Sequence, residues 1–177
     1  DAGITTVIAI TEGVPAHDML RIHSYIRARG ARMLGPNCPG ALSPGKANVG
    51  IIPAEIFTAG NIGLVSRSGT LTYQIGHELT QMGLGNSTIV GIGGDPVVGS
   101  SFIVVLTHFN ADPETEIVVM VGEIGGAEEE KAAAFIGAEM SKAVRDGLPR
   151  LAFIACISVI AALGIDESSW TFSDGTL

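Results

Sequence analysis

Short runs of β-branched and aliphatic residues alternate along the chain with stretches in which apolar residues recur every three or four positions. The short runs are typical of strands, and the second pattern is typical of helices that bury one face. We expect strands at "TTVIAI", "ARML", "IGLV", "STIVG" and "EIVVMV". Because strands and helices take turns, the pattern predicts parallel βαβ units and an α/β fold.

The helices are expected between these strands. The first begins near Pro15, a residue that suits a first helical turn, and Gly30 is placed to cap its end. The second begins near Gly69, and a later one opens with glutamates at 128–130, which suit the positive end of a helix dipole. The apolar faces of the first three helices are expected to hold Met19, Ile22 and Ile26, then Leu71, Ile75 and Leu79, then Phe102, Leu106 and Phe109.

Three of the expected strands end in glycine-rich loops, at 66–70, 91–96 and 122–126. The carboxyl ends of parallel strands lie along one edge of a sheet, where open α/β sheets bind ligands. The three loops should therefore converge. In the first unit the loops at 10–12 and 37–39 should share an edge in the same way. Between the two units, residues 41–60 have no clear period and are broken by glycine or proline at four places, which we interpret as a linker.

Composition and charge narrow the class of protein. The chain has 177 residues, of which 46% are apolar and 16% charged, as in a globular protein with a well-filled core. A formal net charge of −8 argues against a nucleic-acid partner, because phosphate backbones attract basic surfaces. The apolar run "LAFIACISVIAALGI" is shorter than the roughly 20 residues of a membrane span, so we expect a buried helix and no membrane association.

The cysteines and the first residue bear on the origin of the chain. Cys38 and Cys156 are its two cysteines, which predicts no disulfide framework and fits a reducing compartment. The chain starts at Asp1, inside an apolar run and without a methionine, as expected of a fragment or a processed product.

The segment "VSRSGTLTY" joins an expected strand to an expected helix through small residues that bear hydroxyl groups. As an anion site, it would aim the N–H groups of Ser68, Gly69 and Thr70 at a phosphate. As a plain helix start, Ser68 is an N-cap worth about 1 kcal/mol of stability, and the residues alone favour this interpretation slightly. Arg67 is either a phosphate partner or a solvated cation.

Two further loops carry candidate chemistry. In "GEIGG", Glu123 follows an apolar strand and either orients a catalytic group, typically a histidine, or caps the next helix; the two alternatives weigh about equally. In "GIGGDP", Gly93, Gly94 and Asp95 either allow a ligand or another backbone to approach closely, or form a plain turn, which is favoured.

Cysteine and histidine carry weaker signals. Cys38 either faces the thiol end of a ligand or is a small buried residue, which is the more common case. All four histidines fall in helical patterns and are expected on helix surfaces or half-buried, and no pair of them has metal-ligand spacing with an acid, so we expect no metal site. They are His17, His23, His77 and His108.

Five segments, in this order and spacing, resemble the α subunit of succinyl-CoA synthetase (succinate–CoA ligase) from residue 1 to about residue 142. They are "ITEGVPAHDML", "GPNCPG", "VSRSGTLTY", "GIGGDPVVGSSF" and "VGEIGG". ATP-citrate lyase and malate–CoA ligase share related motifs. The resemblance implies a remnant of a Rossmann-like CoA-binding domain over 1–50, an incomplete flavodoxin-like ligase domain over 51–142, and a tail over 143–177 outside the family.

The resemblance also implies an activity and its partners. Succinyl-CoA, phosphate and a nucleoside diphosphate are interconverted with succinate, coenzyme A and the triphosphate through a phosphohistidine, in the citric acid cycle. Mg²⁺ accompanies the nucleotide on a β subunit, which is the expected partner. The expected location is the bacterial cytoplasm, or the mitochondrial matrix in a eukaryote.

Site residues follow from the resemblance by position. The implied coenzyme A contacts are Ile10, Thr11 and Glu12, with Asn37, Cys38 and Pro39 near the pantetheine end. The implied phosphate site is formed by Ser68, Gly69 and Thr70. Tyr73 matches the substrate-contacting tyrosine, and Glu123 matches the acid that orients the phosphohistidine.

The chain departs from the family in two respects. The histidine-bearing segment "GHAGAI" is absent, since no histidine follows His108. We therefore expect the isolated chain to be catalytically inactive, and we interpret the tail from about residue 143 as a shifted reading frame or an aberrant gene end. Val104 stands where relatives tend to carry an acid. The alternative function is a non-catalytic protein that binds coenzyme A, phosphate or a β subunit.

Overall fold

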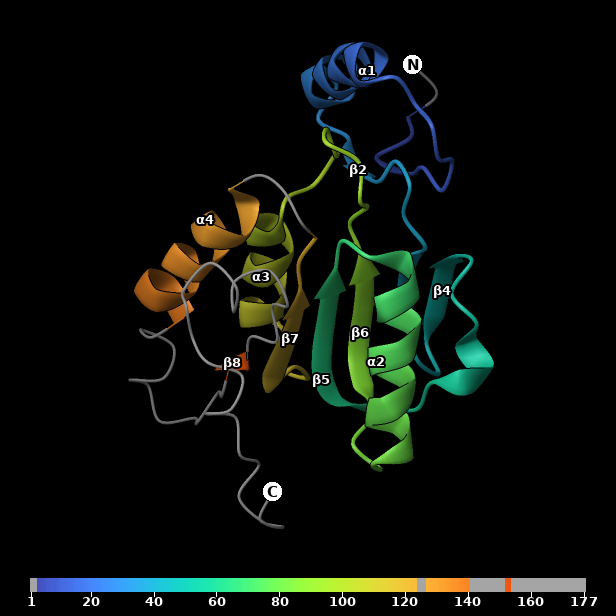
Figure 1. Ribbon diagram of the computed structural model, residues 1–177, viewed down its shortest axis with the longest axis vertical. Helices are drawn as coiled ribbons and strands as arrows, with labels where there is room; N and C mark the ends of the chain where they lie inside the picture. Colours follow the sequence, from blue (N-terminus) through green and yellow to red (C-terminus); the bar gives the residue numbers. More distant parts are fainter. Residues whose placement is uncertain (1–2, 124–126, 141–151, 154–177) are drawn as a thin grey trace.

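A computed structural model describes residues 3–123, 127–140 and 152–153. Its first unit is small and lies at the top of Figure 1, where β1 (Thr6–Ile8) and β2 (Arg32–Leu34) pair in parallel around α1 (Ala16–Ala28). Pro15 stands at the N-cap of α1, and Gly30 follows its C-cap with φ +68°. Met19 is buried, but Ile22 is 38% exposed, so the expected apolar face is only partly covered.

The second unit is built on a six-stranded sheet of order β4-β3-β6-β5-β7-β8. Four neighbouring strands run parallel, and β3 and β4 form an antiparallel hairpin at one edge. This mostly parallel α/β architecture confirms the expected fold class. The strands are β3 (Gly40–Ser43), β4 (Ala47–Gly50), β5 (Ala59–Ser66), β6 (Asn86–Gly91), β7 (Ile117–Val121) and β8 (Ala152–Phe153).

The linker expected over residues 41–60 is wrong. These residues form most of the hairpin, a short 3-10 helix η1 (Ala54–Ile56) and the start of β5, and β3 pairs with β6 through Leu42 and Ile89. The hairpin therefore belongs to the second sheet, although its residues lie before the boundary expected between residues 50 and 51. Short strands with glycine or proline at their ends carry too few apolar positions to show a period.

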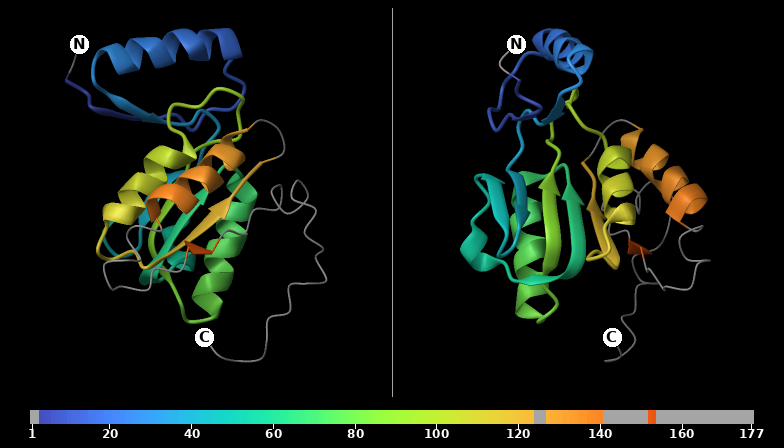
Figure 2. Two further views of the ribbon diagram at one scale, coloured as in Figure 1. Left: turned by 90° about the vertical axis from the view of Figure 1, so that its left-hand side faces the viewer. Right: turned by 180° about the vertical axis from the view of Figure 1, so that it is seen from behind.

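Helices cover both faces of the second sheet, as Figures 1 and 2 show. On one face lies α2 (Gly69–Gln81); on the other lie α3 (Phe102–Ala111) and α4 (Glu128–Phe135), the last continued by a π-helical turn, η2 (Ile136–Met140). Side chains of β7 alternate between the two layers: Val118 and Met120 pack with α3, and Val119 and Val121 with the core under α2. Burial on both faces explains the continuous apolar run of this strand.

Hydrogen bonds join the two units along a short seam. The Gly35 N–H donates to the Ile92 carbonyl, and the Gly99 N–H donates to the Gly35 carbonyl at 2.8 Å. The Ser100 hydroxyl donates to the Met33 carbonyl at 2.7 Å. The loop after β2 is thereby fixed against the loop after β6.

The apolar run at 151–165 lies mostly outside the described residues. Within it Ala152 and Phe153 form β8, which pairs in parallel with β7. No helix in the described ranges is long and apolar enough to cross a membrane.

Candidate functional site at the carboxyl ends of the strands

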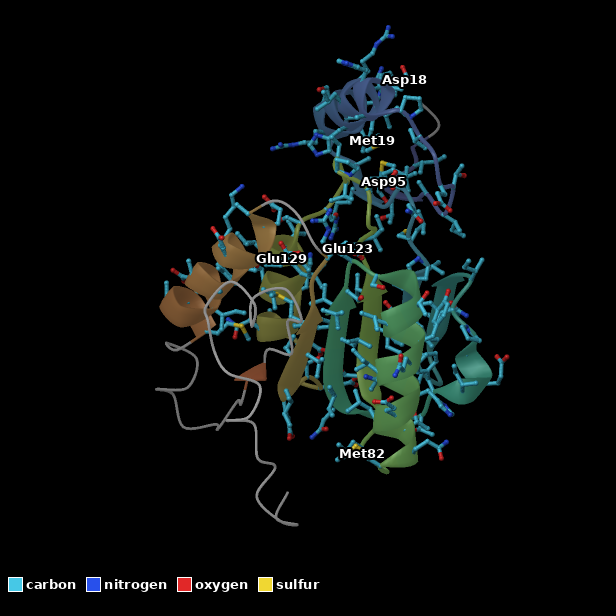
Figure 3. The ribbon with its side chains drawn as sticks, viewed as in Figure 1. Asp18, Met19, Met82, Asp95, Glu123 and Glu129 are labelled. Atoms are coloured by element: carbon cyan, nitrogen blue, oxygen red, sulfur yellow. The ribbon has the colours of Figure 1, made fainter. Side chains whose placement is uncertain are left out.

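The carboxyl ends of β5, β6 and β7 meet as the glycine-rich loops predicted. The Ile92 N–H donates to the Ser66 carbonyl at 2.8 Å, and the Arg67 N–H donates to the Val121 carbonyl at 3.0 Å. Figure 3 shows Asp95, Glu123 and Glu129 close to this edge, above the ends of the strands. The predicted convergence of the three loops is confirmed for their described residues; residues 124–126 of the third loop lie outside the described ranges.

The start of α2 forms one wall of this edge. Ser68 caps the helix, because its hydroxyl accepts the Leu71 N–H at 3.4 Å. The Ser68 N–H does not point outward as expected, because it donates to the Ser66 hydroxyl at 3.1 Å. The N–H groups of Gly69 and Thr70, in the first helical turn, have no acceptor among the described residues. They are the two amides of this segment that remain available to an anion.

Arg67 precedes Ser68 in the chain and is 8% exposed, so the solvated alternative is wrong. Its Nη2 donates to the carbonyls of Asp95 at 2.9 Å and Gly94 at 3.4 Å, and its Nε donates to that of Gly93 at 3.4 Å. On its other side, Nη1 lies 3.9 Å from a carboxylate oxygen of Glu129. The guanidinium thus connects the loop after β6 to the first turn of α4.

Glu123 is half-buried directly after β7. Its N–H donates to Oε1 of Glu129 at 3.0 Å, and its own carboxylate has no hydrogen-bond or ion-pair partner in the described part of the chain. The helix-capping alternative finds no support, since α4 begins without a side-chain cap. A carboxylate held by its backbone and left unpaired is suited to accept a proton or a hydrogen bond.

The loop after β2 joins the same edge from the first unit. Asn37 has φ +54°, its N–H donates to the Thr11 carbonyl at 2.9 Å, and its Nδ2 donates to Oδ1 of Asp95 at 3.0 Å. The Asn37 carbonyl accepts the N–H of Gly94 at 3.4 Å. The loops at 10–12 and 37–39 therefore share an edge as predicted, and they touch the loop after β6. Ile10, Thr11 and Glu12 are exposed there.

Close backbone approach explains the glycines after β6. Gly93 has φ +100°, and a Cβ on it would collide with the Pro36 carbonyl; a Cβ on Gly91 would collide with the Pro39 ring. Of the alternatives for "GIGGDP", the approach of another backbone is confirmed.

Cys38 and Tyr73 are neighbours below this loop. Cys38 is 3% exposed and its thiol donates to the Ala9 carbonyl at 3.4 Å, so the buried alternative is confirmed. Burial raises the pKa of the Cys38 thiol, because a thiolate would lose its hydration. Burial, and then the nearby thiol, raise the pKa of Tyr73, which packs against the core under α2. Both groups are therefore neutral hydrogen-bonding groups near neutral pH.

A cavity of about 570 Å³ adjoins this edge between the units. Arg67 and Pro96 line it from the second unit, and His23, Arg27 and Arg32 line it from the first. His17 and His108 are exposed, and His77 is half-buried on α2, so all four histidines lie as expected. No group of three His, Cys, Asp or Glu among the described residues is arranged to hold a metal ion.

The part played by Glu129 was not predicted. The sequence shows three consecutive glutamates, and they differ only in the side of the helix on which they lie. Glu129 is three positions before the buried Ala132 and so lies on the same side as that residue. Glu128 pairs with Lys131 on the exposed side. That spacing is the signal that identifies Glu129 as the inward-facing acid.

Comparisons with known proteins show the family of this chain. The CoA-ligase family profile matches residues 65–160, beyond residue 142 where the resemblance was expected to end. An ADP-forming succinate–CoA ligase subunit alpha 2 of Archaeoglobus fulgidus is 58% identical over 144 residues, 81% of this chain and 50% of that protein. The corresponding subunit alpha of Aquifex aeolicus is 52% identical over 160 residues, 89% of this chain and 50% of that protein. The chain spans about half the length of these relatives.

Solved structures share the fold. A dinucleotide-forming acetyl-coenzyme A synthetase of Ca. Korarchaeum cryptofilum has a TM-score of 0.70 at 22% identity, covering 92% of this chain and 35% of that chain. An ATP citrate lyase of Methanothrix soehngenii, solved with citrate and coenzyme A, has a TM-score of 0.69 at 23% identity. The match covers 96% of this chain and 27% of that chain. At these identities the likeness concerns architecture alone.

Proposed function

Because the chain belongs to the CoA-ligase family, we propose that it supplies part of the α subunit of a succinate–CoA ligase. That enzyme would interconvert succinyl-CoA, phosphate and a nucleoside diphosphate with succinate, coenzyme A and the triphosphate. The observation that carries the proposal is the convergence of three glycine-rich strand ends on the first turn of α2. Such a rim offers backbone dipoles to a phosphoryl group without adding net charge.

Each group at the rim has a proposed task. The amides of Gly69 and Thr70, with the hydroxyl of Ser68, would hold the phosphoryl group. Uncharged donors suit a group that has to be released again, because they bind it less tightly than a cluster of cations would. The free carboxylate of Glu123 would orient the phosphorylated imidazole by accepting its ring N–H.

Coenzyme A would bind at the exposed loop formed by Ile10, Thr11 and Glu12. The hydrogen bond from Asn37 to the Thr11 carbonyl supports this placement, because it links that loop to the phosphoryl rim. Cys38 and Pro39 would line the approach of the pantetheine end, with the protonated thiol of Cys38 as a non-nucleophilic wall. Tyr73 would contact the acyl substrate through its hydroxyl group.

We propose that none of the four histidines in this sequence is the imidazole that would be phosphorylated. Three of the four histidines are accounted for on helix surfaces, and His23 lines the cavity from α1 rather than from a strand-end loop. We therefore propose that this polypeptide alone does not form a phosphohistidine, and that a β subunit carries the nucleotide with Mg²⁺. The proposed location is the bacterial cytoplasm, or the mitochondrial matrix of a eukaryote.

The test is to incubate the full chain with a succinate–CoA ligase β subunit and ATP labelled in its γ-phosphate. We expect the β subunit to be retained by the tagged chain, with no acid-labile label on the chain. Acid-labile label on the chain would contradict the loss of the phosphorylation site. Failure to retain the β subunit would contradict the assignment as part of an α subunit.

The second candidate is a non-catalytic protein that binds coenzyme A or phosphate. The free amides of Gly69 and Thr70 favour it, because their availability does not depend on a histidine. Calorimetric titration with coenzyme A and with inorganic phosphate, in the absence of a β subunit, separates the two: binding without β retention favours this candidate.

A further inference from the structure

Arg67 is a buried cation whose Nε and Nη2 atoms donate to the protein backbone. Its guanidinium makes three hydrogen bonds to the consecutive carbonyls of residues 93–95. Carbonyl oxygens accept its protons but do not cancel its charge, so burial would be costly without an anion nearby. Arg67 thus braces the loop after β6 through Nε and Nη2, while Nη1 faces Glu129.

Glu129 supplies that anion. Its side chain is 7% exposed, and its Oε1 lies 3.9 Å from Nη1 of Arg67. The same oxygen accepts the N–H of Glu123 at 3.0 Å. Oε1 of Glu129 therefore interacts with two groups at once: the buried guanidinium of Arg67 and the backbone N–H of Glu123, which follows β7.

Stability alone does not explain this pair. Buried ion pairs are often replaceable by apolar residues of similar size without loss of stability, because desolvation offsets most of their attraction. An apolar pair would fill the volume but would leave the carbonyls of residues 93–95 and the N–H of Glu123 without partners. What the pair adds is a fixed spacing between the loops after β5, β6 and β7.

We propose that Arg67 and Glu129 are positioning residues that fix the backbone of Glu123 against the loops that form the phosphoryl rim, and with it a carboxylate that has no partner among the described residues. That this arrangement serves the orientation of a phosphorylated imidazole rests on the proposed function of Glu123. The connection itself, from residues 93–95 through Arg67 and Glu129 to the N–H of Glu123, does not depend on it.

Amide hydrogen exchange of the full chain, followed by NMR, tests the connection. In Glu129→Ala the amide of Glu123 should exchange at least about tenfold faster than in the wild type, since it loses a charged acceptor. Glu129→Gln keeps an oxygen at the same place and should restore most of the protection. Glu128→Gln is the matched control, because Glu128 pairs with Lys131 at the surface and should leave the exchange of Glu123 unchanged.

A double variant separates positioning from stability. Arg67→Met with Glu129→Leu should lower the denaturation midpoint less than either single change does, because it leaves no buried charge unpaired, while the amide of Glu123 still exchanges rapidly. Core amides at Leu64 and Val119 report on global opening and should exchange more slowly in the double variant than in either single variant. Retention of wild-type protection at Glu123 in Glu129→Ala or in the double variant would overturn the proposal.

The same measurement distinguishes this inference from the proposed function. If Glu123 behaves as expected but the β subunit is not retained, the connection stands and the assignment to an α subunit fails. If the β subunit is retained and the Glu123 amide is indifferent to Glu129, the positioning role fails and the assignment stands.

Discussion

The two units of the molecule share a βαβ pattern but differ in how they bury their helices. In the first unit α1 buries only Met19, whereas in the second α3 buries four residues against the sheet. Five of the nine large apolar side chains that are exposed among the described residues lie in the first unit, within residues 3–34: Ile4, Ile10, Leu20, Ile22 and Tyr25. The second unit therefore holds the core, and the first is held largely by its seam with the second.

The difference between the two units indicates that the candidate site owes its rigidity to the second unit. The proposed phosphoryl rim, formed by the loops after β5, β6 and β7 with the first turn of α2, stands on strands that are buried on both faces. The loops at 10–12 and 37–39 contact the rim from the first unit through seam hydrogen bonds such as that from Asn37 to Asp95. A change in the core should destabilise the whole second unit, and a change in the seam should release the first unit while the rim persists.

The largest effect is expected from the core. Leu106 is fully buried between the sheet and α4, so Leu106→Ala should lower the free energy of unfolding by about 2–5 kcal/mol through lost burial and a cavity. Leu20→Ala on α1, where the side chain is 53% exposed, should change it by less than about 0.5 kcal/mol. Urea denaturation followed by circular dichroism measures both. Equal losses would mean that the two units share one core after all.

The seam should give the next largest effect. Gly93→Ala forces a side chain into a backbone at φ +100° that faces the Pro36 carbonyl, and we expect a loss of about 1–3 kcal/mol. Limited proteolysis should then cut the first unit faster while the second resists. Gly13→Ala is the control, because Gly13 also has positive φ but faces open space. Faster cleavage in both variants, to the same extent, would speak against the seam.

A smaller effect is expected at alkaline pH. Burial raises the pKa of Cys38 in the folded chain, so the unfolded chain releases its thiol proton first as the pH rises. The contribution of Cys38 to the free energy of unfolding is therefore complete below the ordinary thiol pKa of about 8.5, and it is lost as the pH rises toward the folded value. Cys38→Ala should flatten this decline in urea titrations at rising pH, and Cys156→Ala serves as the comparison. An unchanged slope in Cys38→Ala would contradict the burial of the thiol.

The smallest effect is expected at the surface of the second unit. Lys46 and Glu114 form an ion pair in which both side chains are 57% exposed. Water and salt screen such a pair, so Lys46→Met should cost no more than about 1 kcal/mol and less in high salt. Thermal melts at two salt concentrations check this. A larger loss that salt does not reduce would show that the hairpin edge depends on the pair.

The fold was predictable where the residue pattern was long. Leu71, Ile75 and Leu79 predicted α2, and the apolar run before Glu123 predicted β7, because burial imposes a period on enough positions to be seen. The β3–β4 hairpin was missed, since all four residues of β4 are exposed and show no alternation. The edge of the sheet needs only backbone pairing, which leaves little trace in sequence.

For the site, the sequence predicted which loops meet but not which groups of those loops contact one another. Strand-end glycines predicted that three loops meet, because that follows from the topology of a parallel sheet. The roles of Arg67 and Glu129 were not predictable, because their partners are carbonyls and an N–H group that any sequence would offer. Residue type marks the donors and acceptors at such a site, and only the folded backbone shows which of them meet.

Phosphate binding by the full chain tests the central claim most directly, namely that the first turn of α2 and the strand-end loops bind a phosphoryl group. Ser68→Asp keeps an N-cap oxygen for Leu71 but places a negative charge at the rim, whereas Ser68→Asn keeps the cap without the charge. In ³¹P NMR titrations with inorganic phosphate we expect the affinity of Ser68→Asp to fall at least about tenfold, as repulsion across a partly solvated contact predicts, and that of Ser68→Asn to stay near the wild type. Equal affinity in all three proteins, or no binding by the wild type, would contradict the account.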